Sequence, residues 1–177
     1  MKKIYIIATD NKTWIAKFFR IAVKEKFVHI SIALDKKCKR VYSFGRKKAK
    51  WPLPAGFINE DFEAISKNYH GSLCRVYELE ITNAQYYKLK NDLRNNYMKD
   101  AIKYRYNIRG LPFLGINFVY HRKYHYVCSQ FCGKILIDSG IIDFKKDYSV
   151  IKPQDFFQLP NIKLIFEGKT VDYLRTI

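Results

Sequence analysis

One stretch, residues 126–136, constrains the fold of this chain more than any other. The β-favouring residues Tyr126 and Val127 lead into Cys128, where an amphipathic helix is predicted to begin. A change from strand to helix at this point places Cys128 at a helix N-terminus, where unpaired backbone N–H groups converge. These groups favour a thiolate over a thiol and would stabilise an oxyanion formed beside it.

The position of Cys128 also has a purely structural interpretation. The predicted helix has an apolar stripe with the i, i+3, i+4, i+7 spacing of a buried face, made of Cys128, Phe131, Cys132 and Ile135. Core packing alone would explain such a stripe. A catalytic role for Cys128 therefore needs a base and an orienting group from elsewhere in the chain.

Length and charge limit the classes of protein that this chain can represent. Its 177 residues are enough for one domain with a hydrophobic core, and we expect a single domain over residues 1–177. Lys and Arg number 33 against 16 Asp and Glu, which gives a net charge of +17 and favours an anionic partner. Residues 36–50 hold eight basic residues and residues 101–137 hold six, and neither segment has an acidic residue. Because no recognisable nucleic-acid-binding module is present, nucleic acid is disfavoured as the partner, and an anionic membrane surface is retained.

Cysteine usage and the apolar runs favour a reduced, cytoplasmic protein. The four cysteines do not have the density of a disulfide scaffold. The apolar run after Met1 is too short for a signal peptide, and no run is long enough to span a bilayer.

Hydrophobic periodicity predicts strands and helices along the whole chain, which is typical of an α+β fold. The expected strands are residues 4–8, 27–34, 40–44, 74–81 and 161–167. The expected helices are residues 12–26, the segment from a Thr82–Gln85 capping box to about residue 103, and residues 128–138. The remaining segments are expected to be a loop at 45–58, a short acidic helix or irregular excursion at 59–68, an irregular connection at 104–120, a turn opening a brief helix at 150–156 and a tail at 169–177.

His29 is the best-placed candidate base. Alternation in the strand at 27–34 puts His29 on a face otherwise made of small residues, opposite the apolar face. A symmetric turn would pair Ile32 with Tyr42, and this register would place Ser43 on the same face as His29, one diagonal step away. The alternative is a structural or surface histidine. The other histidines, His70, His121 and His125, lie in loop-like surroundings and are expected to be surface residues.

A metal site is the competing interpretation of the region around Cys128. The sequence offers two imidazoles and two thiols within twelve residues, namely His121, His125, Cys128 and Cys132. Zinc is disfavoured because Cys132 would lie one helical turn inside an apolar face. We expect neither a metal nor a cofactor.

Three segments together resemble the circularly permuted branch of the NlpC-type papain-like superfamily, the YiiX-like group. They are residues 26–35 around His29, residues 41–47 and residues 126–131 around Cys128. In ordinary papain-like enzymes the cysteine helix precedes the histidine strand. Here the histidine strand comes first, as in the permuted branch, and the resemblance covers nearly the whole chain.

The resemblance implies a permuted papain-like fold, in which an antiparallel sheet or barrel packs against the Cys128 helix. It also implies a cysteine hydrolase or acyltransferase. It makes Cys128 the nucleophile and His29 the base, and it puts the third catalytic position, often Glu or His in relatives, at or near Ser43. The implied substrates are small peptides, muropeptides or lipid-like acyl compounds, processed through an acyl-enzyme by amidase, thiol-protease or acyl-transfer chemistry. The alternative from a different class is a non-catalytic basic protein that binds an anionic surface or nucleic acid.

Overall fold

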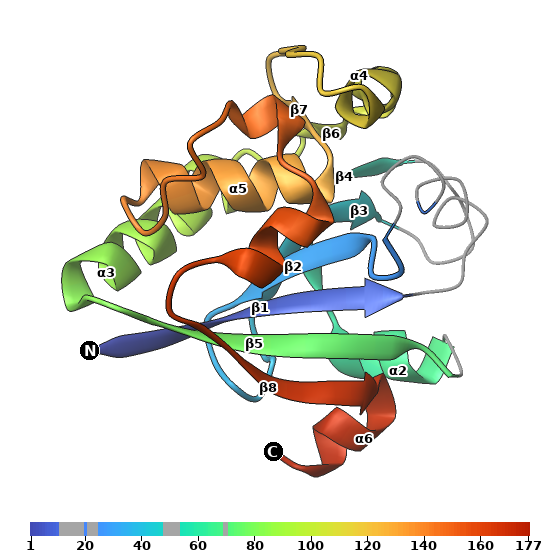
Figure 1. The fold of residues 1–177 in the computed structure, drawn as a ribbon, viewed down its shortest axis with the longest axis vertical. Coiled ribbons are helices and arrows are strands. Elements are labelled where there is room, and N and C mark those ends of the chain that lie inside the picture. The colour runs from blue at the N-terminus through green and yellow to red at the C-terminus, as the bar shows by residue number, and fades with distance from the viewer. Residues whose placement is uncertain (11–19, 21–24, 48–53, 69–70) are drawn as a thin grey trace.

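The computed structural model describes residues 1–10, 20, 25–47, 54–68 and 71–177. These residues form an α+β fold built on one mixed eight-stranded sheet (Figure 1). The strand order is β7-β6-β4-β3-β2-β1-β5-β8. Neighbouring strands are antiparallel except β6 and β7, which run parallel, so the sheet is not the purely antiparallel one expected from the sequence.

The strands are distributed along the chain between Lys2 and Lys169. They are β1 (Lys2–Asp10), β2 (His29–Ala33), β3 (Val41–Arg46), β4 (Ala55–Glu60), β5 (Leu73–Ile81), β6 (Arg105–Tyr106), β7 (His125–Tyr126) and β8 (Ile162–Lys169). The α-helices are α2 (Phe62–Asn68), α3 (Asn83–Asp92), α4 (Leu111–Gly115), α5 (Cys128–Asp138) and α6 (Thr170–Arg175). A π-helical turn (Leu93–Met98) continues α3, and short 3-10 turns cover Ile108–Gly110, Tyr148–Val150 and Pro153–Gln158. None of the described helices is long and apolar enough to cross a membrane.

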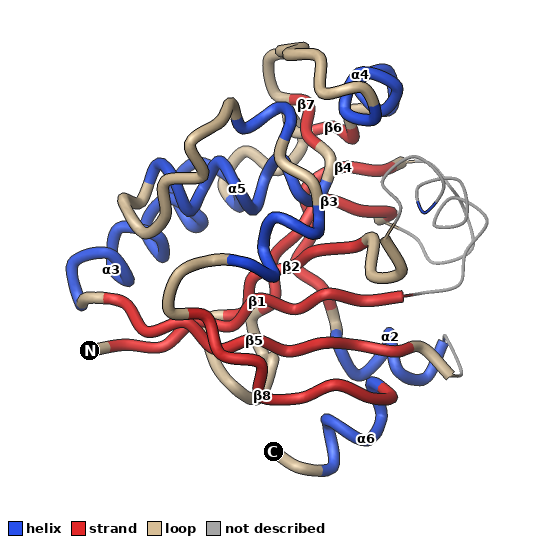
Figure 2. The backbone as a smooth tube through the Cα atoms, in the orientation of Figure 1, coloured by secondary structure: helices blue, strands red, loops and turns tan. Residues whose placement is uncertain are grey.

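Helices cover both faces of the sheet (Figure 2), and the described residues form one large apolar core on each face. On one face, Phe131 of α5 and Leu89 of α3 pack with alternate residues of β2 such as Ile30. On the other face, Phe62 of α2 and Tyr173 of α6 pack with residues of the opposite parity. The period-2 alternation of the strands therefore assigns each side chain to one core or the other.

The local features that the sequence predicts around the site are confirmed. Helix α5 begins at Cys128, and only Val127 separates it from the short strand β7. The hairpin closes in the expected register, with Ile32 opposite Tyr42 and the Leu34 amide donating to the Arg40 carbonyl at 3.1 Å. The Thr82–Gln85 capping box is also present, at the start of α3.

Three segments differ near their ends from what the sequence predicts. The loop expected at 45–58 gives way to strand β4 at Ala55, the helical segment starting at Asn83 ends at Met98 rather than near residue 103, and the expected tail contains helix α6. A tertiary contact explains the first of these differences. Gly56 lets β4 approach β6, because a Cβ at this position would lie 2.2 Å from the Tyr104 carbonyl oxygen. The expected helix at 12–26 falls mostly outside the described residues.

Candidate active site

A buried polar network fixes the start of α5. Val127 has extended backbone angles and its amide donates to the Gln130 side-chain oxygen at 3.0 Å. The Gln130 amide group donates to the Ser149 carbonyl at 2.8 Å, and the Ser129 hydroxyl donates to the Ile151 carbonyl at 2.7 Å. The network ties the first turn of α5 to the segment that follows the helix, which holds the Cys128 backbone in place.

The first turn of α5 leaves backbone donors unused by the helix. The first intrahelical bond runs from the Phe131 amide to the Val127 carbonyl at 3.0 Å. The amides of Cys128, Ser129 and Gln130 lie before that bond and have no partner within the helix. They are the groups that could stabilise an oxyanion formed beside the Cys128 sulfur.

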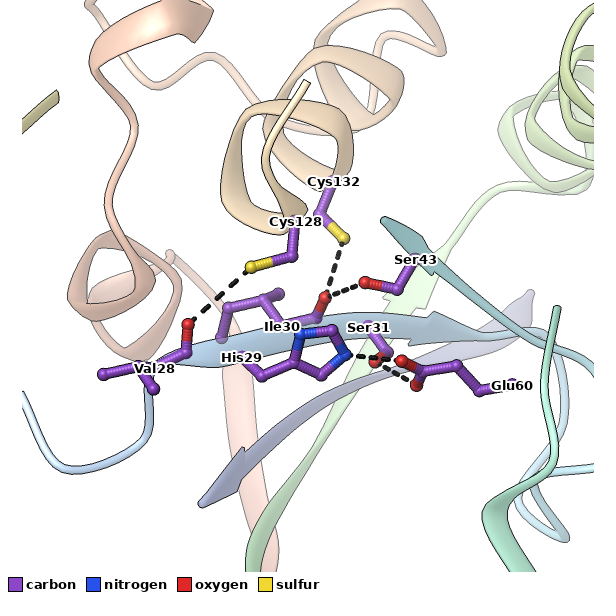
Figure 3. Close-up of polar contacts among 8 residues, drawn as sticks. All are labelled: Val28, His29, Ile30, Ser31, Ser43, Glu60, Cys128 and Cys132. Atoms are coloured by element: carbon purple, nitrogen blue, oxygen red, sulfur yellow. Dashed lines mark hydrogen bonds and ion pairs between the residues drawn. The ribbon is translucent and has the colours of Figure 1, made fainter. Parts of the chain in front are cut away.

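His29 opens strand β2 and is held by a carboxylate. Its Nε2 atom lies 2.5 Å from Oε1 of Glu60, the last residue of β4. The other carboxylate oxygen, Oε2, accepts a 2.5 Å hydrogen bond from the buried Ser31 hydroxyl. Both oxygens of Glu60 are therefore engaged, and the carboxylate fixes the orientation of the imidazole ring (Figure 3).

Cys128 lies on the other side of the imidazole. The ring nitrogen that does not contact Glu60 lies on the side of the ring that faces α5 (Figure 3). The Cys128 thiol donates to the Val28 carbonyl oxygen at 3.7 Å, and Cys128 is among the groups that raise the pKa of His29. Cys128 is 3% exposed and the His29 side chain is 18% exposed. The sulfur thus has polar neighbours although it is shielded from water.

The surroundings of His29 favour its protonated form. Burial acts to lower the pKa of the imidazole, but attraction to the Glu60 carboxylate and hydrogen bonds with Cys128 and Glu60 outweigh burial. The net result is a pKa raised well above the ordinary 6.5. An imidazolium between a thiol and a carboxylate is the arrangement that stabilises a thiolate.

The Ser43 hydroxyl does not bond to His29, although the resemblance places the third catalytic position at or near Ser43. The Ser43 hydroxyl donates instead to the Ile30 carbonyl at 2.6 Å, and the Cys132 thiol donates to the same oxygen at 3.5 Å. The regular β2–β3 pairing comprises Ile32 with Tyr42 and Ala33 with Val41, so the Ile30 carbonyl lies beyond it. Ser43 satisfies this carbonyl, and the side chain that contacts the His29 ring is Glu60.

Sequence patterns do not identify Glu60, because they predict a loop where most of strand β4, which carries Glu60, is found. Val41 lies opposite Glu60 and also opposite Ala33, so the carboxylate shares a sheet face with Ser31 and His29. Residues 56–60 read Gly-Phe-Ile-Asn-Glu, with no alternation of polar and apolar residues to indicate a strand. The prolines and the glycine that precede Glu60 favour a loop instead.

Tyr106 is a further polar residue beside Cys128. It packs against the small cluster formed by Val28, Leu114 and Val127, two of which precede His29 and Cys128 in the chain. Burial raises the pKa of the Tyr106 phenol well above its ordinary value of 10.0, and the negative charge of Cys128 adds to the effect. The phenol therefore keeps its proton at neutral pH.

The four residues considered for zinc do not converge. The His121 Nε2 atom pairs with the Asp147 carboxylate at 2.9 Å, and its ring stacks on Tyr148. His125 Nδ1 contacts the Lys123 carbonyl at 2.7 Å, and Cys132 is fully buried. Within the part of the chain that the structure describes, no group of three or more His, Cys, Asp or Glu side chains could hold a metal ion.

Of the residues singled out from the sequence, the structure brings together Cys128 and His29 and separates Ser43 from both. His121 is exposed and His125 partly exposed, while His70 lies outside the described residues. Comparisons of the chain with protein-family models, curated proteins and solved structures each found no match. The assignment of a function therefore rests on the chemistry of the site.

Proposed function

We propose that this protein is a cysteine hydrolase or acyltransferase of the circularly permuted NlpC-type papain-like class. Cys128 is the nucleophile, His29 is the general acid and base, and Glu60 orients the imidazole and supports its positive charge. One observation carries the proposal: a single imidazole lies between a thiol at a helix start and a carboxylate that is itself fixed by Ser31.

The proposed reaction begins with a Cys128 thiolate and a His29 imidazolium. The sulfur attacks the carbonyl carbon of an ester or amide, and the carbonyl electrons move to oxygen, where the amides at the start of α5 donate to it. The tetrahedral intermediate collapses, His29 protonates the departing group, and a thioester remains on Cys128. Water or another acceptor, deprotonated by His29, then attacks the thioester and releases the acyl group.

Three substrate classes fit this chemistry: small peptides, muropeptides and lipid-like acyl compounds. All present an ester or amide carbonyl to the sulfur. Because Cys128 is 3% exposed, the neighbouring side chains must move aside for a carbonyl to reach it. Binding of the substrate and formation of the reactive geometry are therefore expected to be coupled.

The acyl-enzyme tests the proposal directly. The purified chain is incubated with p-nitrophenyl acetate, quenched in acid, and its mass and modified peptide are determined. We expect one acetyl group on the peptide that contains Cys128. Cys128→Ser should abolish it, whereas Cys132→Ser, one turn along the same helix, should retain it because its hydroxyl can still donate to the Ile30 carbonyl. Acetylation that is spread over lysines and unaffected by Cys128→Ser would contradict the proposal.

A further inference from the structure

The segment 102–124, which we call the apolar–basic lobe, stands out from one end of the molecule. It contains β6, the 3-10 turn Ile108–Gly110 and α4, and it lies next to the start of α5 (Figure 1). Its exposed large hydrophobic residues are unusually many for so short a segment: Ile102, Ile108, Ile116, Phe118, Val119 and Tyr124. Ile116 is 74% exposed and Ile102 is 84% exposed. Large exposed apolar side chains that are concentrated in one short segment indicate an interaction site.

The lobe is an ordered element with an inner and an outer side. On its inner side, Leu114 is buried against Val28 and Val127. On its outer side, the Phe113 ring stacks on Tyr120 with ring centres 4.7 Å apart, and the Phe118 amide donates to the Phe113 carbonyl at 2.9 Å. The exposed apolar residues are therefore presented by a folded scaffold, whose inner side touches the residues next to His29 and Cys128.

The charge of the lobe is wholly positive. Residues 101–137 include no Asp or Glu, and the lobe carries Lys103, Arg105, Arg109, Arg122 and Lys123. Lys103 pairs with Asp100 at 2.6 Å. For the other four, the described residues provide no ion pair with a carboxylate. These cations are available to an external anion.

Aliphatic side chains beside unpaired cations match an anionic lipid bilayer better than nucleic acid. A bilayer surface takes apolar groups into its acyl boundary while its phosphate and carboxylate headgroups attract Arg and Lys. Nucleic acid would use cations together with flat aromatic rings on which bases stack. Ile102, Ile116 and Val119 cannot stack on a base, and the lobe projects outward as a membrane-inserting element must.

We infer that the apolar–basic lobe docks the protein on the surface of an anionic lipid bilayer. Ile116, Phe118 and Val119 enter the interface, and Arg105, Arg109, Arg122 and Lys123 contact the anionic headgroups. The inference is independent of catalysis by Cys128. Docking through this lobe would hold the α5 N-terminus close to the lipid surface.

Co-sedimentation with lipid vesicles tests the inference. The full chain is mixed with vesicles of equal parts phosphatidylcholine and phosphatidylserine, or of phosphatidylcholine alone, at low and high salt. We expect binding to the anionic vesicles, weaker binding at high salt and little binding to the neutral ones. The double variant Ile116→Ser/Phe118→Ser should weaken binding by about tenfold or more, because it removes the inserted apolar area and leaves the net charge unchanged.

Matched controls lie on β8, at the opposite edge of the sheet from β7. Leu164 is 47% exposed and Lys163 is exposed, so Leu164→Ser and Lys163→Gln repeat the same changes outside the lobe. They should bind like wild type, whereas Arg109→Gln should bind more weakly. Cys128→Ser should also bind normally, which separates docking from catalysis. Equal loss in the control variants, unchanged binding in the lobe double variant, or binding to a single-stranded oligonucleotide but not to vesicles would overturn the inference.

Discussion

The Nε2 atom of His29 lies 2.5 Å from Oε1 of Glu60, although the two residues come from strands that do not pair with each other. The contact gives the imidazole a negative partner on the side away from Cys128. It also explains why the pKa of His29 is raised well above 6.5 in spite of burial.

The Glu60 carboxylate should control the titration of His29. In Glu60→Gln the attraction that opposes burial is lost, so the pKa of His29 should fall from its raised value. A pH titration of the His29 ring resonances by NMR measures the change. Glu63→Gln, which removes an exposed carboxylate paired with Lys67, should leave the titration unaltered. Equal titrations in wild type and Glu60→Gln would show that Glu60 does not hold the imidazolium.

Ser31 and Ser43 are buried in the neighbouring strands β2 and β3, and replacing each of them by alanine should have different effects. Ser31→Ala removes the donor to Glu60, so it should slow alkylation of Cys128 as well as destabilise the fold. Ser43→Ala removes a donor to the Ile30 carbonyl, which keeps the Cys132 thiol as a partner. It should cost about 1 kcal/mol of stability and leave the alkylation rate of Cys128 unaltered. Urea unfolding and alkylation kinetics on both variants make the comparison, and the reverse pattern would restore Ser43 as the orienting residue.

Loss of the proton from His29 should make the fold less stable as the pH rises. Below the unfolded-state value of about 6.5 the folded and unfolded chains both bind the proton, and the stabilising contribution is fully present. As the pH rises from there through the raised folded-state pKa, the folded protein loses that contribution. Urea unfolding at a series of pH values should therefore show a decline above 6.5 that is shallower in His29→Gln. A surface variant such as Lys163→Gln should keep the wild-type slope, and a decline of equal slope in His29→Gln would contradict this linkage.

Gln130 should matter more for stability than Gln85, although both are the third residue of a helix. Gln130 is buried and accepts from the Val127 amide while donating to the Ser149 carbonyl. Gln130→Ala should lower the free energy of unfolding by about 2–3 kcal/mol, because it leaves the buried Val127 amide and Ser149 carbonyl without their partner. Gln85→Ala affects an exposed capping box and should cost about 1 kcal/mol or less. Chemical denaturation measures both, and equal costs would argue against a special role of the buried network.

The part of the site that sequence could predict is the part encoded by local patterns. Cys128 follows from a change of period between strand and helix, and His29 follows from strand alternation and the hairpin register. Glu60 could not be found in this way, because its strand contains a glycine, Gly56, that close packing against the residues of β6 requires. Its proximity to His29 depends on how the sheet places β4 relative to β2, which no local pattern specifies.

Site-resolved alkylation of the native protein tests the Cys128–His29 pair most directly. The chain is treated with iodoacetamide at neutral pH, and the modification of each cysteine is followed by mass spectrometry of its peptide. Burial raises the pKa of Cys38 and of Cys74 to about 12, and that of Cys132 well above 9.0, so these three should stay unmodified. We predict rapid modification of Cys128 alone, slowed about tenfold or more in His29→Gln because an unassisted thiol is only a few per cent thiolate. Equally slow modification of all four cysteines, with no effect of His29→Gln, would contradict a catalytic Cys128–His29 pair.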